Sequence, residues 1–530
     1  MKVLSSAAMK EADRRTMEDM GLPGAVLMET AGLRVAEFIF SIHPEPCHVV
    51  VIAGPGNNGG DGLVTARLLY KAGYKVELWS TVKAGAYRGD AAVSEKYLSR
   101  ISFPVRRVAT SRDLERFSIE LSGADLVIDA MLGTGLNRDV EGLIADLIHV
   151  VNESDVPVLS VDAPSGLNTD TGQVMGSAVR ADWTVTFACP KWGLLLLPGA
   201  ALTGELVVAD INIPDLLIED APVELLTAAE IKSCLPDRAF DAHKGTMGRV
   251  LIVSGSPGMS GAAMLAAESA LRGGAGLSYL AAPESVCPAL ESKLVEVITI
   301  ALPELSPGII SPAAVDKIIE LAGNCDAVAV GPGLNPGEET AEILNKLIQL
   351  CPVPVILDAG ALAVLRGNMQ ILRSARHLPL VTPHPGEMAR LAGMKTGQVQ
   401  FSRLETSINF ARLWNCIVIL KGANTIIATP KGKAFINPTG GPALSTAGTG
   451  DLLTGLIASF IAQGISPERA SAAAAFIHGL AGDLLPGRRG HMAGDVLDNY
   501  GAAFHFLETD QAEAGYINPF LKKVRPLPRK

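Results

Sequence analysis

The feature of this sequence that most constrains its fold is a repeated alternation of short apolar runs with amphipathic segments. Two helical segments, about 5–20 and 23–41, precede the first apolar run, "HVVVIAG" (48–54), and a later run is "DLVIDA" (125–130). Short strands that alternate with helices are typical of βαβ units, whose strands pair in parallel. The chain is therefore predicted to be an α/β protein built on mainly parallel sheets.

A change in composition divides this pattern into two halves. Residues 213–245 interrupt the rhythm with prolines and acidic residues, so we place a domain boundary near 220–235. A chain of 530 residues, 48% of them hydrophobic, is long enough for two large domains with separate cores. We expect an N-terminal domain over 1–220 and a C-terminal domain over 228–505.

Charge and cysteine content limit the classes of function. A net charge of −10 disfavours a general nucleic-acid-binding protein, and the basic run "KKVRPLPRK" (522–530) is interpreted as a solvated terminus. Seven cysteines without metal-type or redox-type spacing favour reduced thiols in a cytoplasmic protein. No apolar stretch is long enough to predict a membrane span. We expect a homo-oligomer with no nucleic-acid or membrane partner.

The stretch "GPGNNGGDG" (54–62) places a glycine turn between a strand and a helix. Glycines let main-chain N–H groups approach an anion, and the positive end of the helix dipole adds to the attraction. Asn57 and Asn58 add directed donors and acceptors, which favours a site for a phosphate-bearing ligand. The alternative is a tight connection in which Asp61 only caps the helix.

Two further strands of the first half end in an aspartate. Asp129 follows "DLVI", and Asp162 follows "VLSV" and precedes Ser165. With Asn58 and Ser165, these acids would supply oxygen ligands for a cation and leave one acid for proton transfer. Each aspartate alone is more often a cap than a catalyst, but consecutive strand ends of this kind favour a site.

The second half contains "STAGTGD" (445–451), in which Gly448, Thr449 and Gly450 precede a helix predicted to begin at Asp451. Free N–H groups there would cradle a phosphate, and the Asp451 carboxylate would accept the proton of an alcohol undergoing phosphorylation. This arrangement favours phosphoryl transfer. An ordinary aspartate cap is the alternative.

Other strand ends of the second half carry polar groups. Lys421 and Gly422 in "LKGANT" lie where a nucleotide phosphate would bind, "TPHPGE" supplies His384 and Glu387, and "LDAG" supplies Asp358. Structural roles for His384 and Asp358 remain equally open.

Together, "AGPGNNGGDG", "DAMLGTGLNRDV", "VDAPSGLNTDTG" and "FACPKWGLL" closely resemble the NAD(P)H-hydrate epimerase family, which has a Rossmann-like three-layer fold. The resemblance runs from about residue 1 to 220. It implies that the hydrated dinucleotide binds Asn57, Asn58, Gly59, Gly60, Asp61, Gly133, Thr134, Gly135, Leu136, Asn137, Arg138, Asp139 and Asp162. It also implies a K⁺ site at Asn58, Asp129 and Ser165.

The implied reaction inverts carbon 6 of a nicotinamide ring to which water has added. Because this carbon bears both a hydroxyl and the ring nitrogen, oxygen can leave and return through an iminium-like species. Such a route needs a positioned acid–base group, for which we choose Asp162. Lys191 in "CPKWG" is a second catalytic candidate, and a surface lysine is the alternative interpretation.

In the second half, "HKGTMGRVLIVSGS", "GPGL", "LDAG", "TPHPGE", "LKGANT" and "AGTGD" resemble the ADP- or ATP-dependent NAD(P)H-hydrate dehydratase family, with a ribokinase-like α/β fold. The resemblance covers roughly 228–500. It implies that the hydrate contacts Gly261 or Ala262, Gly333, His384 and Asp451, and that the adenine nucleotide contacts Lys421, Gly422, Ala423, Asn424, Thr425 and Gly450. Gly441 and Ala447 depart from the family pattern, which affects only the local loop.

The implied chemistry phosphorylates the ring hydroxyl, and the nitrogen lone pair then expels phosphate to regenerate the dihydronicotinamide. We expect ADP as donor, with ATP as the alternative, and Mg²⁺ bound with the nucleotide. The dehydratase family acts on the S hydrate, so an epimerase half that converts the R hydrate would let one chain repair both.

Two other functions are compatible with parts of the pattern. One is a ribokinase-like small-molecule kinase with an accessory nucleotide-binding domain. The other is an N-terminal half that only recruits partners.

Overall fold

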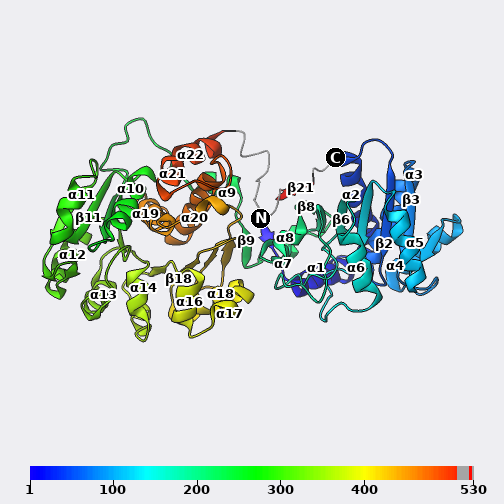
Figure 1. The fold of residues 1–530 in the computed structure, drawn as a ribbon, viewed down its shortest axis with the longest axis horizontal. Coiled ribbons are helices and arrows are strands. Elements are labelled where there is room, and N and C mark those ends of the chain that lie inside the picture. Colours follow the sequence, from blue (N-terminus) through cyan, green and yellow to red (C-terminus); the bar gives the residue numbers. More distant parts are fainter. Residues whose placement is uncertain (510–523, 528–530) are drawn as a thin grey trace. The chain divides into compact units, whose positions relative to one another are not determined.

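The computed structural model describes residues 1–509 and 524–527, which form two compact α/β units (Figure 1). The first unit comprises residues 1–221 and the strand β21 (Val524–Pro526), and the second begins at Pro222. A two-residue strand, β1 (Lys2–Val3), begins the chain. The predicted α/β class, with mainly parallel sheets, is confirmed.

The sheet of the first unit has eight parallel strands in the order β21-β8-β7-β6-β5-β2-β3-β4. Its remaining strands are β2 (His48–Ala53), β3 (Lys75–Ser80), β4 (Val105–Arg107), β5 (Leu126–Ala130), β6 (Val158–Val161), β7 (Trp183–Phe187) and β8 (Glu205–Ala209). The helices are α1 (Ser6–Glu18), α2 (Gly24–Ile42), α3 (Asn57–Lys71), α4 (Gly89–Arg100), α5 (Ser111–Leu121), α6 (Leu143–Asn152), α7 (Trp192–Leu195) and α8 (Ala200–Thr203).

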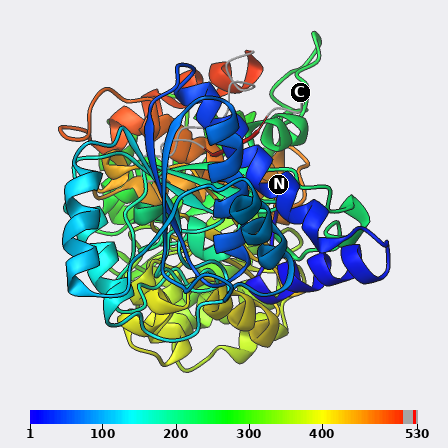
Figure 2. The ribbon, with the colours of Figure 1, turned by 90° about the vertical axis from the view of Figure 1, so that its right-hand side faces the viewer.

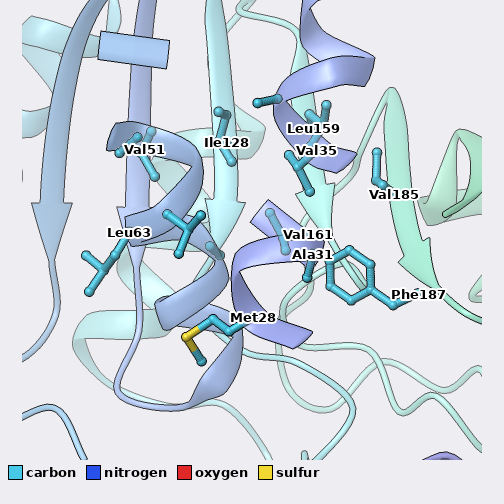
Figure 3. Packing of buried hydrophobic residues seen from close by; sticks show 14 of the residues in the cluster. Met28, Ala31, Val35, Val51, Leu63, Ile128, Leu159, Val161, Val185 and Phe187 are labelled. Carbon is cyan, nitrogen blue, oxygen red and sulfur yellow. The ribbon is translucent and has the colours of Figure 1, made fainter. Parts of the chain in front are cut away.

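Helices cover both faces of this sheet, which makes three layers (Figure 2). Successive side chains of a strand point to opposite faces. Val51 therefore packs among residues of α2 and α3, as Figure 3 shows, whereas Val50 and Ile52 pack among residues of α5 and α6. Burial on both faces explains the continuous apolar run at 48–54.

The strands of the second unit lie in the order β9-β20-β19-β18-β17-β16-β15-β10-β11-β12. Their bounds are β9 (Val223–Leu225), β10 (Arg249–Val253), β11 (Leu277–Pro283), β12 (Ile298–Leu302), β15 (Ala327–Val330), β16 (Val355–Leu357), β17 (Leu380–Val381), β18 (Ile417–Leu420), β19 (Ile426–Ala428) and β20 (Ala434–Ile436). A separate hairpin joins β13 (Glu304–Ser306) and β14 (Ile309–Ile310).

Two central helices of the second unit, α10 (Ser260–Arg272) and α19 (Thr449–Ala462), pack against each other, and α19 also packs on β10 and β15. The other helices are α9 (Ala228–Cys234), α11 (Cys287–Glu291), α12 (Val315–Ala322), α13 (Glu338–Leu350), α14 (Gly360–Leu365), α15 (Gln370–Arg373), α16 (Pro385–Ala392), α17 (Thr396–Phe401), α18 (Arg403–Trp414), α20 (Pro467–Asp483), α21 (Ala493–Asp498) and α22 (Tyr500–Glu508).

Each sheet has a switch point at which strand order reverses. In the first unit the chain passes from β2 outward through β3 and β4, then returns to pair β5 on the other side of β2. In the second unit it passes from β10 through β11 and β12, then returns to pair β15 with β10. Ligands of open α/β sheets bind outside the carboxyl ends of strands at such points.

Several elements differ from the sequence predictions. β19 pairs antiparallel with both β18 and β20, so this strand runs opposite to its neighbours in the second sheet. Within the basic run at 522–530, Val524–Pro526 pair with β8 as a strand, so a wholly solvated terminus is wrong there. Among the described residues, no helix is long and apolar enough to cross a membrane.

Gly455 on α19 provides a test of this packing. A Cβ at this position would lie 2.0 Å from the main-chain oxygen of Ala266 on α10, so Gly455→Ala should force the two helices apart. We expect a loss of about 1–3 kcal/mol in the free energy of unfolding of the second unit, measured by calorimetry. Gly397→Ala, where a Cβ meets open space within α17, is the matched control and should not destabilise the protein. An equal effect of both substitutions would contradict the packing described here.

Candidate active sites

The first unit contains a cavity of about 650 Å³ at the carboxyl ends of β2 and β5, next to the switch point of its sheet. The predicted residues Asn57, Asn58, Asp61, Gly133, Thr134, Gly135, Leu136, Asn137, Arg138 and Asp162 line this cavity. Gly59, Gly60 and Asp139 do not. The two glycine-rich loops and the strand-end acid are thus brought to one place.

Close contacts within the fold, as well as ligand binding, account for the glycines of residues 54–62. α3 begins at Asn57 with Gly56 as its N-cap, so Asp61 lies inside the helix and the interpretation of Asp61 as a cap is wrong. A Cβ on Gly59 would lie 1.9 Å from the oxygen of Gly54, and one on Gly60 would lie 2.6 Å from the Met28 side chain. These glycines let α3 start directly at the strand end.

Asp162, which lines this cavity, forms an ion pair with the buried Lys191. Lys191 Nζ donates to Asp162 Oδ1 at 2.6 Å, to Thr186 Oγ1 at 2.9 Å and to the oxygen of Phe187 at 3.2 Å, which uses its three protons. Its side chain is 1% exposed, so the surface-lysine interpretation is wrong. Lys191 lies behind Asp162, which itself lines the cavity.

The backbone of Asp162 adopts a left-handed conformation with φ 61°. Such a conformation is strained for an aspartate and is commonly found at functional sites. Oδ1 accepts hydrogen bonds from Thr186 Oγ1 at 3.0 Å and from the N–H of Phe187 at 3.3 Å, as well as from Lys191. Oδ2 has no hydrogen-bond partner within residues 1–509 and 524–527. One oxygen of Asp162 is fixed and the other is available.

Asp13, Asp61 and Asp90 also line this cavity, and the pKa values of the first two are raised. Burial, reinforced by the negative charges of Asp162 and Asp13, raises the pKa of Asp61 well above its ordinary value. Burial, opposed by Lys191 and reinforced by Asp162, raises the pKa of Asp13 to about 6. Asp13 was missed in the sequence, because an acid on an amphipathic helix is usually solvated; its spacing from Lys10 and Met17 on one helix face was the available signal.

Asn58, Asp129 and Ser165 converge around the main chain of Leu132. Ser165 Oγ donates to Asp129 Oδ1 at 2.5 Å and lies 2.8 Å from the Leu132 nitrogen, and Asn58 Nδ2 donates to the Leu132 oxygen at 3.0 Å. Asn58 Oδ1 is buried without a hydrogen-bond partner. An unpaired buried oxygen beside a carboxylate and a hydroxyl is the chemistry expected of a K⁺ ligand set.

In the second unit, a lysine from one strand end contacts an aspartate from another. Lys421 Nζ, after β18, lies 2.7 Å from Asp358 Oδ1, after β16, and Asp358 Oδ2 accepts a hydrogen bond from Thr454 Oγ1 at 2.8 Å. Although burial lowers the pKa of Lys421, the charges of Asp358 and Glu387 raise it overall, so Lys421 stays protonated. A Cβ on Gly450 would lie 3.2 Å from Lys421 Nζ, which places this turn beside the ammonium.

Asp451 lies in the first turn of α19, beside this ion pair. The helix begins at Thr449, two residues earlier than predicted, and its N-cap is Gly448 with φ 95°. Asp451 is therefore not the helix cap. Burial, reinforced by Asp358 and Glu387 and opposed by Lys421, raises the pKa of Asp451 to about 7. This value suits a group that takes up and releases a proton near neutral pH.

His384 and Glu387 begin α16. His384 Nδ1 accepts a hydrogen bond from the N–H of Gly386 at 3.0 Å, and Glu387 Oε2 accepts one from the N–H of His384 at 2.8 Å. His384 is thus a structural cap, yet its side chain is half exposed and remains accessible to a ligand. Ala262 and Gly333 lie together, since a Cβ on Gly333 would be 3.3 Å from that of Ala262, and Gly261 is exposed at the start of α10.

The predicted nucleotide-binding stretch, Lys421 to Thr425, has two unusual features. The side chain of Asn424, including both polar atoms, is buried without a hydrogen-bond partner, and its φ is 53°. Below the turn at Gly422, the buried guanidinium of Arg403 donates to the oxygens of Leu420 at 3.1 Å and Lys421 at 3.3 Å. No local sequence pattern points to Arg403, which is distant along the chain.

Two family models match the chain, one in each unit. The model for the YjeF-related protein N-terminus matches residues 24–193, and the model for NAD(P)H-hydrate dehydratase matches residues 250–500.

Relatives match over both units. The bifunctional NAD(P)H-hydrate repair enzyme Nnr of Moorella thermoacetica is 43% identical over 94% of this chain and 96% of its own. The enzyme of that name in Escherichia coli is 31% identical over 92% of this chain and 91% of its own. Among solved structures, the ADP/ATP-dependent NAD(P)H-hydrate dehydratase of Bacillus subtilis is 29% identical, and the match covers 54% of this chain and 99% of that chain with a TM-score of 0.45. Because the relatives match over nearly the full length of both sequences, this chain belongs to the family of bifunctional NAD(P)H-hydrate repair enzymes.

Proposed function

We propose that this chain repairs hydrated NADH and NADPH by epimerising the R and S hydrates in its N-terminal half and dehydrating the S hydrate, with a nucleotide as phosphoryl donor, in its C-terminal half. The observation that carries this proposal is the match to bifunctional relatives across both units. It favours repair over a ribokinase-like kinase or a recruitment module. We assign epimerisation to a domain over residues 1–220 and dehydration to a domain over residues 228–505.

For epimerisation, we assign the acid–base role to Asp162. Proton transfer to the ring hydroxyl lets oxygen leave as water while the ring nitrogen lone pair forms a C=N bond. Water then adds to the opposite face of the ring and gives up a proton, which restores the hydrate with inverted carbon 6. Lys191 acts as a positioning residue, since its ammonium fixes Oδ1 of Asp162 and lies behind it. The first turns of α3 at 57–61 and the loop at 133–139 bind the dinucleotide.

The K⁺ site of the N-terminal half is assigned to Asn58, Asp129 and Ser165. The unpaired Oδ1 of Asn58 supports this assignment. When bound, K⁺ supplies fixed positive charge beside the turn that begins at Gly133, a turn that also lines the cavity.

For dehydration, we assign Asp451 as the base that accepts the proton of the ring hydroxyl. The hydroxyl oxygen bonds to the terminal phosphorus of the donor as the bond to the remaining nucleotide breaks. The ring nitrogen lone pair then expels phosphate, and loss of a proton from the neighbouring carbon restores the double bond. Gly261 or Ala262, Gly333 and His384 hold the hydrate in this scheme.

The adenine nucleotide is assigned to the stretch Lys421 to Thr425 and to Gly450, with Mg²⁺ bound to its phosphates. We favour ADP as donor, which yields AMP and phosphate. The ammonium of Lys421, oriented by Asp358, supplies positive charge to the transferring phosphoryl group.

The first test uses two variants with reciprocal effects. Asp162→Ala should lower conversion of the R to the S hydrate by about 10² or more and leave dehydration of the S hydrate intact. Asp451→Ala should stop dehydration while nucleotide binding and epimerisation persist. Purified R or S hydrate is supplied with ADP or with ATP, and return of dihydronicotinamide absorbance is followed. Absence of repair by the unsubstituted chain with either donor would reject the proposed function.

The second test uses pH. Asp451 must be ionised to accept a proton, and its pKa is raised to about 7, so the rate of dehydration should rise with pH through that region. Glu387→Gln removes a negative charge that raises this pKa, so the rise should move to lower pH. A glutamine oxygen can still accept the N–H of His384, so the helix cap remains. The exposed Glu405→Gln serves as the control and should not move the profile.

The third test concerns the cation. Replacement of K⁺ by a bulky organic cation should lower both the epimerisation rate and the unfolding temperature of the first unit, because the site oxygens lose their ligand. Calorimetry measures the second effect independently of activity. Asn58→Ala should abolish the response to K⁺. If the unsubstituted chain shows no response to K⁺, the assignment is wrong.

A further inference from the structure

We propose that Asp13 is a second catalytic carboxyl group of the N-terminal site, which exchanges one proton with the ring hydroxyl or the attacking water while Asp162 exchanges the other. This inference rests on the proposed epimerase function. Inversion needs oxygen to leave one face of the ring and return to the other. One acid–base group can exchange a proton with the oxygen on one face of the ring, and two groups can do so on both faces.

The position of Asp13 satisfies the first requirement, access to the substrate. Lys10, Asp13 and Met17 are spaced by three and four residues, so they share one face of α1, and all three line the cavity. α1 is fixed at its start, where the N–H of Ser6 donates to Asp170 Oδ1 at 2.7 Å. The cavity face of α1 is thus a fixed wall of the site.

The second requirement is a carboxyl group that is free to exchange protons. Asp13 is partly buried and forms no hydrogen bond or ion pair among the described residues. Asp162 differs, because Lys191 donates a hydrogen bond to one of its oxygens at 2.6 Å. The two carboxyl groups therefore lie in different electrostatic environments, as expected of an acid and a base in one site.

Charged groups surround Asp13 on several elements. Those that line the same cavity are Lys10 on α1, Asp61 on α3, Asp90 on α4, Arg138 after β5 and Asp162 after β6, and Lys191 lies behind Asp162. Burial is the largest influence and raises the pKa of Asp13 to about 6. Asp61 is more deeply buried than Asp13, and burial raises its pKa well above its ordinary value.

The proton balance of the proposed step is complete. Asp13 donates its proton to the hydroxyl on carbon 6, the C–O bond breaks, and the electron pair of the ring nitrogen forms the C=N bond as water departs. A water on the other face then bonds to carbon 6, the C=N electrons return to nitrogen, and Asp162 accepts the proton released. The roles exchange in the reverse direction. No oxidant, reductant or other reactant is needed.

The test is the Asp13→Asn variant of the full chain, with the R and S hydrates separated chromatographically and the rate without enzyme subtracted. Because the substitution preserves shape and Asp13 has no hydrogen bond to lose, the fold should be retained, and an unchanged unfolding temperature of the first unit confirms it. We expect the kcat of epimerisation to fall by about 10² or more, with KM changed less than about threefold. The fall in rate as pH rises past the pKa of Asp13 should disappear from the variant and persist, displaced, in Asp13→Glu.

Glu11→Gln on the exposed side of the same helix is the matched control and should leave epimerisation unchanged. A decrease in kcat of less than about tenfold, a change confined to KM, or a pH profile in Asp13→Asn identical to that of the unsubstituted chain would overturn the assignment of Asp13. If the unsubstituted chain dehydrates the S hydrate but has no epimerase activity, the proposed function of the first unit fails, and the role of Asp13 fails with it.

Discussion

Parallel pairing of strands is the constraint on which both units depend. In a parallel sheet every strand begins at one edge and ends at the other, so each loop that follows a strand emerges on the same side as its neighbours. At a switch point two adjacent loops turn in opposite directions, and a space opens between them. The cavity between the loops after β2 and β5 has this origin. Residues that are far apart in the sequence meet there without any long-range motif.

Both units contain a lysine–aspartate ion pair of similar geometry. Each pairs a lysine that follows one strand with an aspartate that follows another, at 2.6 Å for Lys191 and Asp162 and 2.7 Å for Lys421 and Asp358. Removing one partner of a buried pair leaves an uncompensated charge and is strongly destabilising. Because both charges also lose their hydration, an intact buried pair is often no more stabilising than apolar residues of similar volume. In each unit another carboxyl group, Asp13 or Asp451, lies near the pair and has a raised pKa, which suits proton transfer.

The sequence predicts the architecture well because apolar runs and glycine turns are local signals. The strands that lead to Asp129, Asp162, Asp358 and Lys421 were all identified, and these side chains lie where loops converge. Features that depend on contacts distant in the chain were not predictable. In the sequence Asp13 resembles an ordinary helical acid, and only the packing of α1 against the cavity shows its position. Lys191 resembles a surface residue, and only its three hydrogen bonds in the folded protein show that it is buried. The pairing of 524–526 with β8 is another such case.

The pairing of β21 with β8 affects the order in which the chain can fold during its synthesis. Because β21 belongs to the first unit and follows the second in the chain, the first unit is interrupted by the whole of the second. A ribosome must therefore synthesise the whole of the second unit before the outermost strand of the first sheet is available. Until then the amide groups along the outer side of β8 lack this partner and present an open edge of the kind that promotes association between nascent chains.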